Sequence, residues 1–403
     1  RFVGDYALNS NFEDSRPTAM PDTDKRVAVI GAGPSGLSCA YYLRLLGHGV
    51  DVFEAESVAG GVLYWGIPEY RLPNEVLAKE IRAIEDTGVK IHTNTRVGEN
   101  IRMEDVIANY DAIYIAIGTQ KSRLLDIPGE DLPQVMSGLR FLKCVGLNKP
   151  MEIPWSLVVV GGGNTAMDVA RTAVRLGVKD VTMVYRRTLE EMPADEREIV
   201  EATEEGVTIE TLASPLEILP DENGNVRAIA FMRMCQTDFD SDGRRRTKVI
   251  EDSRFEIPCD CVVTAVNQEV DKGFFRTKED GTSVFTPESM NKFTGGTTDD
   301  GIFLGGDTAP WGKNVVIQAI ADGKRAASSI DKYLGGAGVL NKGSDIEDIP
   351  VMDITETTQP HDRFPHKVIP PEVRTKSFVE VECGFHRLDA MGEALRCLHC
   401  DRR

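Results

Sequence analysis

The chain has 403 residues, enough for two or three domains, and its 41% hydrophobic and 27% charged residues predict a globular protein without a membrane span or secretory signal. Its formal net charge of −18 argues against general affinity for nucleic acid or for anionic membranes. Eight scattered cysteines in a chain of this size favour a reducing, cytoplasmic compartment over a disulfide framework.

A strand–helix–strand unit is predicted after a lead-in of residues 1–24, which we expect to be extended. Residues 27–30 form a short apolar run typical of a buried parallel strand. Residues 37–46 have helical character and residues 50–54 predict a second strand. The pattern indicates one complete nucleotide-binding βαβ unit.

The loop of this unit has the spacing of a dinucleotide-binding fingerprint. Gly31 suits the tight turn, Gly33 lets the backbone approach a pyrophosphate, and Gly36 allows close helix–strand packing. Glu54 ends the second strand, about 20 residues downstream, where an acid binds a ribose hydroxyl. The helix start should hold the phosphates with its free N–H groups. The residues predicted for this site are Gly31, Gly33, Pro34, Ser35, Gly36, Glu54 and Ala55.

A second unit repeats this plan, with strands at residues 157–160 and 181–185 and a helix at 167–176. Its fingerprint has alanine in the third place, which the motif allows. The next strand ends in Arg186 and Arg187 rather than in an acid. Arginine binds a 2′-phosphate that an acid would repel, so we predict NADPH and keep NADH as an alternative. The predicted residues are Gly161, Gly163, Asn164, Thr165, Ala166, Arg186 and Arg187.

The remaining chain predicts three further features. Residues 206–265 alternate short β-prone pieces with turn signals, at residues 223–224 and 242–243, and are interpreted as a β-meander attached to the second unit. Residues 302–304 predict another strand, which is followed by glycines and a helix at about 314–334. Residues 335–380 predict an irregular tail, with a short helix near 387–396.

Two segments carry a family resemblance. Residues 29–37, with the sequence VIGAGPSGL, resemble the FAD half of the glutathione-reductase-type flavoproteins. Residues 60–73, GGVLYWGIPEYRLP, resemble the small (β) subunit of bacterial glutamate synthase and its relatives. Those relatives include the flavin domains of dihydropyrimidine dehydrogenase and of NADH-dependent ferredoxin:NADP oxidoreductase. The resemblance implies that Gly61, Leu63 and Arg71 lie near FAD.

The resemblance extends to four more places. Residues 305–307 are similar to a motif whose aspartate binds the ribityl chain of FAD, and residues 314–323 to a helix that points at the flavin. Asn314 stands where threonine is usual, and either can cap a helix. Residues 112–119 and 262–268 resemble the strands where the two domains meet. The predicted FAD site therefore also includes Val97, Gly118, Thr119, Gly306, Asp307, Val315 and Val316.

Hydride transfer between a nicotinamide and a flavin needs no side-chain acid or nucleophile, so no catalytic residue is nominated. Cys259 and Cys261 are interpreted as buried strand cysteines that share one face, not as a redox pair beside the flavin. Electrons should therefore leave through an iron–sulfur cluster in a partner or missing domain. Cys397 and Cys400 resemble the start of cluster ligands in the family, but two thiolates cannot complete a four-cysteine site, and no metal is predicted.

The sequence thus predicts an α/β fold of two Rossmann-like dinucleotide-binding domains of glutathione-reductase type, with a β-meander insertion. The expected order is a lead-in (1–24), an FAD-binding domain in two parts (25–150 and 276–336) around an NAD(P)H-binding domain (151–275), and an irregular tail (337–403). The chain opens on Arg1, and its first residues resemble the segment after an N-terminal cluster domain in this family. We therefore expect a fragment of a longer polypeptide.

The predicted function is NAD(P)H-dependent transfer of electrons between FAD and an iron–sulfur partner or larger catalytic subunit, as in glutamate synthase small subunits. One alternative is a flavin module of an anaerobic electron-bifurcating or hydrogenase-linked complex. Another is a scaffold subunit that binds FAD without catalysis. The final electron acceptor, the direction of transfer and the oligomeric state are not specified by these residues.

Overall fold

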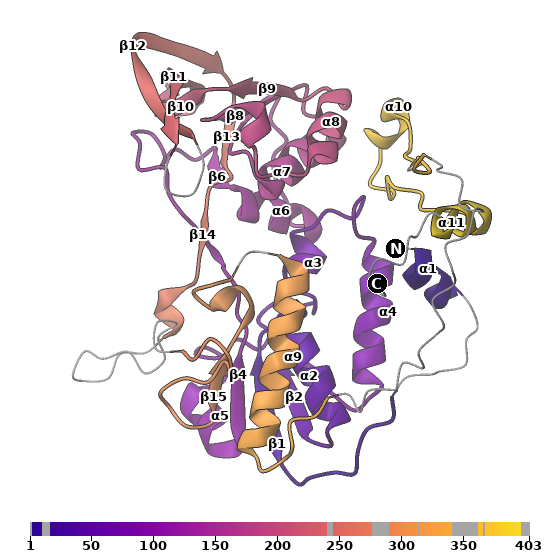
Figure 1. Cartoon of the computed structure of the whole chain (residues 1–403). Coiled ribbons are helices and arrows are strands. Elements are labelled where there is room, and N and C mark those ends of the chain that lie inside the picture. Colours follow the sequence, from indigo (N-terminus) through magenta and orange to yellow (C-terminus); the bar gives the residue numbers. More distant parts are fainter. Residues whose placement is uncertain are drawn as a thin grey trace.

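This computed structural model describes residues 2–9, 17–239, 245–275, 290–312, 315–340, 362–365 and 367–395. The chain forms two lobes, each built around a five-stranded parallel sheet, with a smaller antiparallel sheet on the second lobe (Figure 1). The predicted α/β fold with two Rossmann-like domains is therefore confirmed. Within the described part of the chain, no helix is both long and apolar enough to span a membrane.

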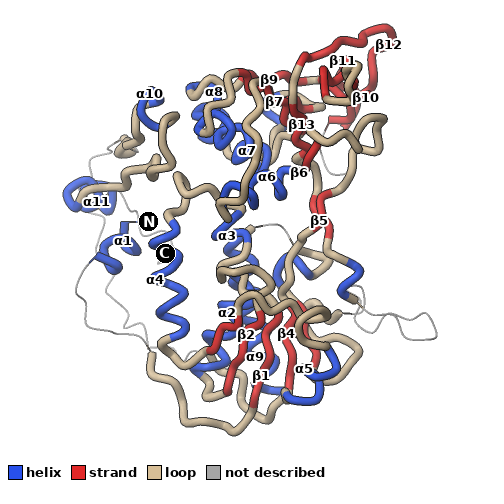
Figure 2. Tube along the Cα trace, turned by 180° about the vertical axis from the view of Figure 1, so that it is seen from behind, coloured by secondary structure: helices blue, strands red, loops and turns tan. Residues whose placement is uncertain are grey.

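The first lobe has the strand order β15-β4-β1-β2-β3. Its central strand is buried on both faces, because Val27 and Val29 pack in one hydrophobic cluster and Ala28 and Ile30 in another. Helices α2 and α9 cover the first face side by side, and α5 contributes to the second (Figure 2). The elements are β1 (Arg26–Ile30), α2 (Pro34–Leu45), β2 (Gly49–Phe53), α3 (Val62–Trp65), α4 (Asn74–Glu85), β3 (Lys90–His92), α5 (Met103–Asn109), β4 (Ala112–Ile115), β15 (Ile302–Leu304) and α9 (Val316–Tyr333).

The second lobe has the order β6-β13-β7-β8-β9. Leu157 and Val159 of its strand β7 pack in the cluster that contains α7, whereas Val158 and Val160 pack toward the antiparallel sheet. The elements are β6 (Val135–Ser137), α6 (Gly138–Gly146), β7 (Ser156–Val160), α7 (Asn164–Arg175), β8 (Asp180–Tyr185), α8 (Glu196–Glu204), β9 (Thr208–Thr211) and β13 (Cys261–Thr264).

The predicted β-meander is confirmed as a three-stranded antiparallel sheet of consecutive strands, β10 (Ala213–Pro220), β11 (Val226–Phe239) and β12 (Arg245–Pro258). Its predicted bounds of 206–265 are too wide, because β9 and β13, at the two ends of that range, pair in the parallel sheet. Gly224 has the positive φ of +83° that the predicted turn between β10 and β11 requires. The second predicted turn, at residues 242–243, lies outside the described residues.

The expectation of a fully extended lead-in is wrong for α1 (Phe2–Asn9). The rings of Phe2 and Tyr6, one helical turn apart, lie 5.9 Å from each other. Aromatic pairs at this spacing stabilise a helix. The sequence does not predict α1, because Gly4 disfavours a helix and the segment is only eight residues long.

The chain crosses between the lobes along a two-stranded ribbon, in which β5 (Lys121–Ser122) pairs with β14 (Gln268–Glu269) (Figure 2). The position of this ribbon agrees with the resemblance, which places the meeting of the two domains at residues 112–119 and 262–268. Strand β6 already pairs with β13 of the second sheet. That pairing favours a domain boundary before residue 135 rather than at 150. Near the end of the described chain lie α10 (Pro371–Arg374) and α11 (Arg387–Ala394).

Candidate dinucleotide-binding sites

The residues predicted for FAD gather at one edge of the first sheet. Gly31 follows β1, Glu54 follows β2, Val97 lies beyond β3, Gly118 beyond β4, and Gly306 beyond β15. All five strands are parallel, so these positions share the carboxyl edge of the sheet. Ligands of open α/β sheets bind at this edge.

The glycines of the first fingerprint differ in what surrounds them. A Cβ on Gly31, whose φ is +102°, would lie 2.5 Å from the carbonyl oxygen of Ala116, and one on Gly36 would lie 1.9 Å from the carbonyl oxygen of Gly31. A Cβ on Gly33 would meet nothing within 4 Å. The protein's own packing therefore requires Gly31 and Gly36, whereas the space at Gly33 fits the close approach of a pyrophosphate.

Gly33 is the N-cap of α2 and has no side chain to cap the helix, while Pro34 and Ser35 form its first turn. Gly61, with φ +56°, packs directly on this turn, since its Cβ would lie 2.9 Å from the Cα of Gly33. Leu63 lies nearby along the chain, in α3. The helix start thus presents N–H groups and a positive dipole end beside open space, which suits an anion.

Glu54 is held rigidly at the end of β2. Its carboxylate accepts hydrogen bonds from the backbone N–H of Ala32 at 2.8 Å and of Glu56 at 2.9 Å, so it joins the fingerprint loop to the segment that contains Ala55. Burial raises its pKa, although these two N–H groups and Lys143 oppose the shift. A fixed acceptor at this place fits the ribose contact that the spacing predicts.

The last strand brings the distant segment 305–308 to the same edge. The backbone N–H of Gly118 donates to Thr308 Oγ1 at 2.8 Å, and Gly306 adopts φ +63° in the turn that contains Asp307. Thr119 donates to Gln268 Oε1 at 3.1 Å and so faces the ribbon between the lobes. The two parts of the first lobe are therefore joined directly at the predicted site.

Helix α9 begins with exposed apolar residues. Val315 and Val316 are 47% and 37% exposed, and Val315 provides no side-chain cap. An uncapped helix start with apolar side chains fits contact with a flat, polarisable ring whose edge carries negative charge. The expected cap, Asn314, lies outside the described residues.

Arg71 points toward the second lobe. Its guanidinium contacts Asp168 on α7 at 2.7 Å and Glu198 on α8 at 3.1 Å. Burial raises the pKa of Asp168 to about 6, because loss of solvation outweighs the attraction of Arg71. In this structure Arg71 therefore forms a contact between the two lobes. Its position near FAD, which the resemblance implies, stays a prediction.

A buried charge cluster around Glu205 continues from this contact and is not predicted by the sequence. Glu205 accepts hydrogen bonds from Arg171, Arg175 and Arg374. The ring of Tyr70 packs against two of these arginines, with its centroid 3.8 Å from the guanidinium carbon of Arg175. Although burial opposes it, hydrogen bonds from Arg175 and Arg171 lower the pKa of Glu205 to about 2. The spacing of Arg171 and Arg175, one turn apart on α7, is the one local signal of this cluster in the sequence.

The second fingerprint reproduces the first in its geometry. A Cβ on Gly161 would lie 2.4 Å from the carbonyl oxygen of Ala265, whereas the nearest atom to one on Gly163 is Pro193 Cγ at 3.8 Å. Gly163 is the N-cap of α7 and carries no capping side chain. Ala166, in the third place of the motif, is fully buried. We call each glycine loop together with the helix start that follows it a cradle: the first is formed by residues 31–36 and the second by residues 161–166. The second cradle lies at the carboxyl edge of the second sheet.

The other predicted residues surround this cradle. Asn164 and Thr165 form the first turn of α7, and Thr165 Oγ1 accepts a hydrogen bond from Gln268 at 3.4 Å. Arg186 is exposed and Arg187 half-buried, directly after β8. They occupy the place at the end of the second strand that Glu54 occupies in the first lobe, where they could reach the 2′-phosphate of a nucleotide.

The pyridine nucleotide-disulphide oxidoreductase family matches residues 25–326. The chain belongs to this family. It is 39% identical to the NADP(+)-dependent formate dehydrogenase subunit beta of Moorella thermoacetica, over 96% of the chain and 56% of that protein. It is 34% identical to the glutamate synthase (NADPH) small chain of Escherichia coli (strain K12), over 83% of the chain and 74% of that protein. Its fold matches FprA from Mycobacterium tuberculosis in complex with NADPH, with a TM-score of 0.65, 21% identity, and coverage of 78% and 85%.

The predicted resemblance to glutamate synthase small subunits and the predicted oxidoreductase class are both confirmed by these relatives. Membership of the pyridine nucleotide-disulphide oxidoreductase family implies binding of FAD and a pyridine nucleotide. The chain spans little more than half the length of the formate dehydrogenase subunit, 56%.

The family name includes a disulphide, but Cys259 and Cys261 do not provide one: both are free and buried. Burial raises the pKa of each thiol to about 12, which keeps it protonated and unreactive. The expectation that they share one face is wrong, since they pack in different hydrophobic clusters. The chain turns between them at Asp260, so the alternation of a strand is broken. Cys397 and Cys400 lie outside the described residues, among which no group of three metal-ligating side chains occurs.

Proposed function

We propose that this chain is an FAD-containing oxidoreductase module that passes electrons between NADPH and an iron–sulfur partner or larger catalytic subunit. The observation that carries this proposal is the repetition of one cradle at two sheet edges, with an acid ending the strand in the first lobe and arginines in the second. We include a reducing, cytoplasmic compartment in the proposal, which the free state of six described cysteines supports.

Each lobe contributes binding and orientation. The starts of α2 and α7 hold the two pyrophosphates with backbone N–H groups, and Glu54 holds the ribose of FAD. Arg186 and Arg187 hold the 2′-phosphate of NADPH. The first turn of α9 directs its positive dipole end at the flavin. When bound, the two cofactors supply the hydride chemistry, so no side chain of this chain needs to move a proton during that step.

The reaction balances without a further group. NADPH loses a hydride, which is two electrons and a proton, and becomes NADP⁺. Two one-electron acceptors each take one electron, and one proton is released to solvent. Electron transfer in the opposite direction, from the one-electron carriers to NADP⁺, uses the same contacts.

An anaerobic titration of the purified yellow protein with NADPH and NADH tests the proposal. We expect NADPH to bleach the flavin absorbance and to bind at least tenfold more tightly than NADH. Replacing both arginines, Arg186→Gln with Arg187→Gln, should abolish that preference, because a charge-assisted bond to phosphate contributes about 1.5–3 kcal/mol. The matched control is the double variant Arg227→Gln with Arg254→Gln, which removes two exposed arginines of the same lobe that both pair with Glu256. Equal affinities of wild-type protein for the two nucleotides would contradict the NADPH assignment.

A second candidate is a flavin module within a larger electron-bifurcating or hydrogenase-linked complex. It is favoured by the partial coverage of the formate dehydrogenase subunit, which extends well beyond this chain. The same titration separates both enzymes from a non-catalytic FAD scaffold, since a scaffold would stay oxidised when NADPH is added.

A further inference from the structure

The outward side of α9 differs from the rest of this acidic chain. Ile317 and Ile320 are 72% and 39% exposed near its start. Lys324, which is partly exposed, lies seven residues after Ile317 and therefore on the same helix face, and Lys332 is exposed two turns further. The helix thus presents apolar groups followed by basic groups to solvent.

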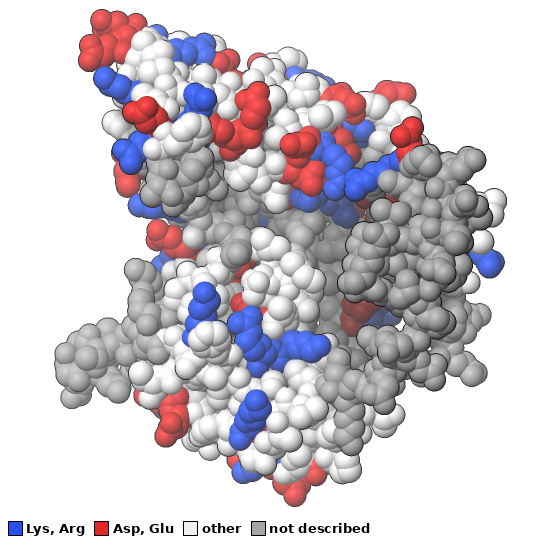
Figure 3. Space-filling view, viewed as in Figure 1, with Lys and Arg blue, Asp and Glu red and all other residues white. Residues whose placement is uncertain are grey.

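Both carboxylates of α9 are directed inward. Asp322 exposes 5% of its side chain and pairs with Arg325, and Asp331 exposes 7% and pairs with buried His48 at 2.9 Å. No acid of this helix therefore offsets its two lysines, although the chain carries a net charge of −18. Figure 3 shows Lys and Arg atoms gathered over α9 on a surface that is otherwise largely uncharged.

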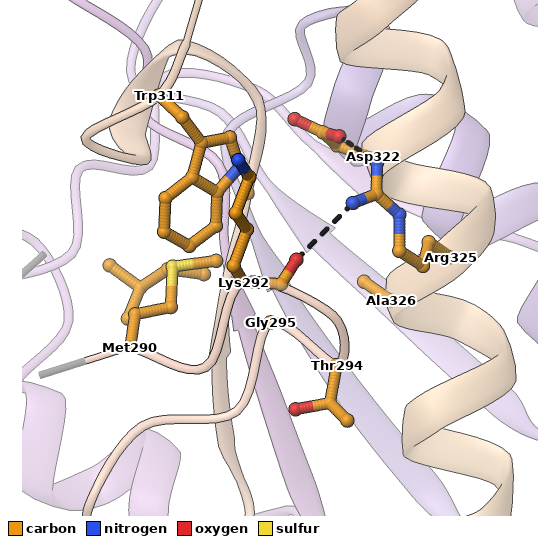
Figure 4. Close-up of a pocket in the computed structure, with 10 residues that line it drawn as sticks. Met290, Lys292, Thr294, Gly295, Trp311, Asp322, Arg325 and Ala326 are labelled. Carbon is orange, nitrogen blue, oxygen red and sulfur yellow. Dashed lines mark hydrogen bonds and ion pairs between the residues drawn. The ribbon is translucent and has the colours of Figure 1, made fainter.

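A shallow hollow adjoins α9 on one side. Figure 4 shows the indole of Trp311 and the side chain of Met290 together, opposite Arg325 on the helix. Arg325 also donates to the backbone carbonyl of Lys292 at 3.3 Å, which fixes the loop beside the helix. The next residue of that loop, Phe293, is 82% exposed. Basic and apolar groups thus continue from the helix onto the neighbouring loop.

We propose that this α9 surface, formed by Ile317, Ile320, Lys324, Lys332, Lys292 and Phe293, docks a small acidic electron-carrier protein. The inference rests on the proposed function, which requires a one-electron acceptor. Basic residues attract an acidic partner over long range and set its orientation, while exposed apolar side chains provide area that is removed from water on contact. An acidic chain of this charge would otherwise repel such a carrier.

The position of the surface suits electron transfer. A helix rises about 1.5 Å per residue, so Lys324 lies about 12 Å and Lys332 about 24 Å along α9 from Val316. A standard interface covers about 800 Å² on each partner, which is roughly 30 Å across. A carrier centred on Lys324 therefore reaches both Lys332 and the first turn of α9, beside which we propose that the flavin lies.

Binding of a fluorescently labelled acidic [2Fe–2S] ferredoxin of the plant type provides the test. Its Kd is measured at low and high salt for wild-type protein and for the double variant Lys324→Glu with Lys332→Glu. The control, Lys79→Glu with Lys90→Glu, makes the same change in net charge at exposed positions of α4 and β3. We expect the α9 variant to bind at least tenfold more weakly at low salt, the control less than threefold, and wild-type binding to weaken as salt rises.

Ile317→Ser should also weaken binding, by a few fold, without changing its salt dependence. Equal affinities of the α9 variant and the control, or wild-type binding that ignores salt, would overturn the docking proposal. These binding measurements do not depend on flavin reduction. A second assay tests the proposed function independently of docking. If wild-type protein does not reduce a neutral quinone with NADPH, the proposed function is wrong, whatever the binding measurements show. The α9 variant should reduce that quinone at the wild-type rate.

Discussion

Exchange of Gly33 for alanine should separate FAD binding from folding. The backbone at this position has φ −76° and ψ 179°, which alanine adopts without strain and which the following proline also favours. A Cβ there meets nothing within 4 Å of protein. We therefore expect Gly33→Ala to leave the free energy of unfolding of the apoprotein unchanged or to raise it by about 0.4–1 kcal/mol, through a less flexible unfolded chain.

Binding should respond in the opposite sense, because the methyl group occupies the space proposed for the pyrophosphate. A 100-fold weaker Kd corresponds to about 2.7 kcal/mol. At an FAD concentration 100 times the wild-type Kd, bound FAD stabilises wild-type protein by about 2.7 kcal/mol. At the same concentration the variant would gain only about 0.4 kcal/mol.

The assay is chemical denaturation of apoprotein with and without added FAD, with Gly36→Ala as the matched comparison. A Cβ on Gly36 would lie 1.9 Å from the carbonyl oxygen of Gly31, so α2 must shift and the apoprotein itself should lose about 1–3 kcal/mol. If Gly33→Ala apoprotein is stable and still gains the full wild-type increment from FAD, the ligand does not approach Gly33 and the reasoning fails.

The second cradle, the buried thiols, the contact between the lobes and cofactor retention each give one more expectation. Gly163→Ala should weaken NADPH binding at least tenfold, as measured by nucleotide titration, because the new methyl group occupies the space proposed for the pyrophosphate. Flavin content should not change, since the nearest protein atom is 3.8 Å from that methyl group and the fold can accept it. Replacing Cys259 and Cys261 by alanine should leave NADPH-driven quinone reduction within twofold of wild type, since both thiols stay protonated; loss of turnover would show that they take part. The pKa of Asp168 is raised to about 6, so at this group the folded state binds more protons than the unfolded state, and its contribution to the free energy of unfolding should fall as pH rises from about 4 to about 6. Across that window the stability of wild-type protein should therefore fall relative to that of Asp168→Asn, because carboxylates with a lowered pKa, such as Glu205, contribute equally in both proteins. Gel filtration should remove NADP⁺ from the protein but leave FAD bound; loss of both would contradict the assignment of a resident flavin.

The two cradles can be predicted from sequence because their determinants are local. Gly31, which makes the tight turn, and Gly36, which allows close helix packing, lie five positions apart in the sequence. A Cβ at either position would clash with a backbone oxygen, of Ala116 for Gly31 and of Gly31 for Gly36. The strand-end residues Glu54 and Arg186 follow at a spacing set by one helix and one strand. These signals fit within about 30 residues, the length of one βαβ unit.

Contacts between segments that are distant in the sequence cannot be predicted in this way. Arg374 and Glu205 are 169 residues apart, and neither carries a local pattern that differs from a solvent-exposed charge. Arg71 belongs to a recognisable motif, but its ion pair with Asp168 depends on how one lobe packs against the other. Strand β6 carries no signal of the sheet that it joins, because its three half-buried residues show no alternation.

The two cradles share a backbone geometry and differ in what encloses them, which explains why one nucleotide should stay bound and the other exchange. The first is closed by Gly61 packed on Gly33, by the turn at Gly306, and by Glu54, which is 7% exposed and holds two backbone N–H groups. The second ends in Arg186, an exposed side chain on a flexible stem. A preorganised, buried acceptor loses little freedom when it binds, whereas an exposed arginine must be ordered each time. The same fold can therefore retain a flavin in one lobe and release a spent nicotinamide from the other.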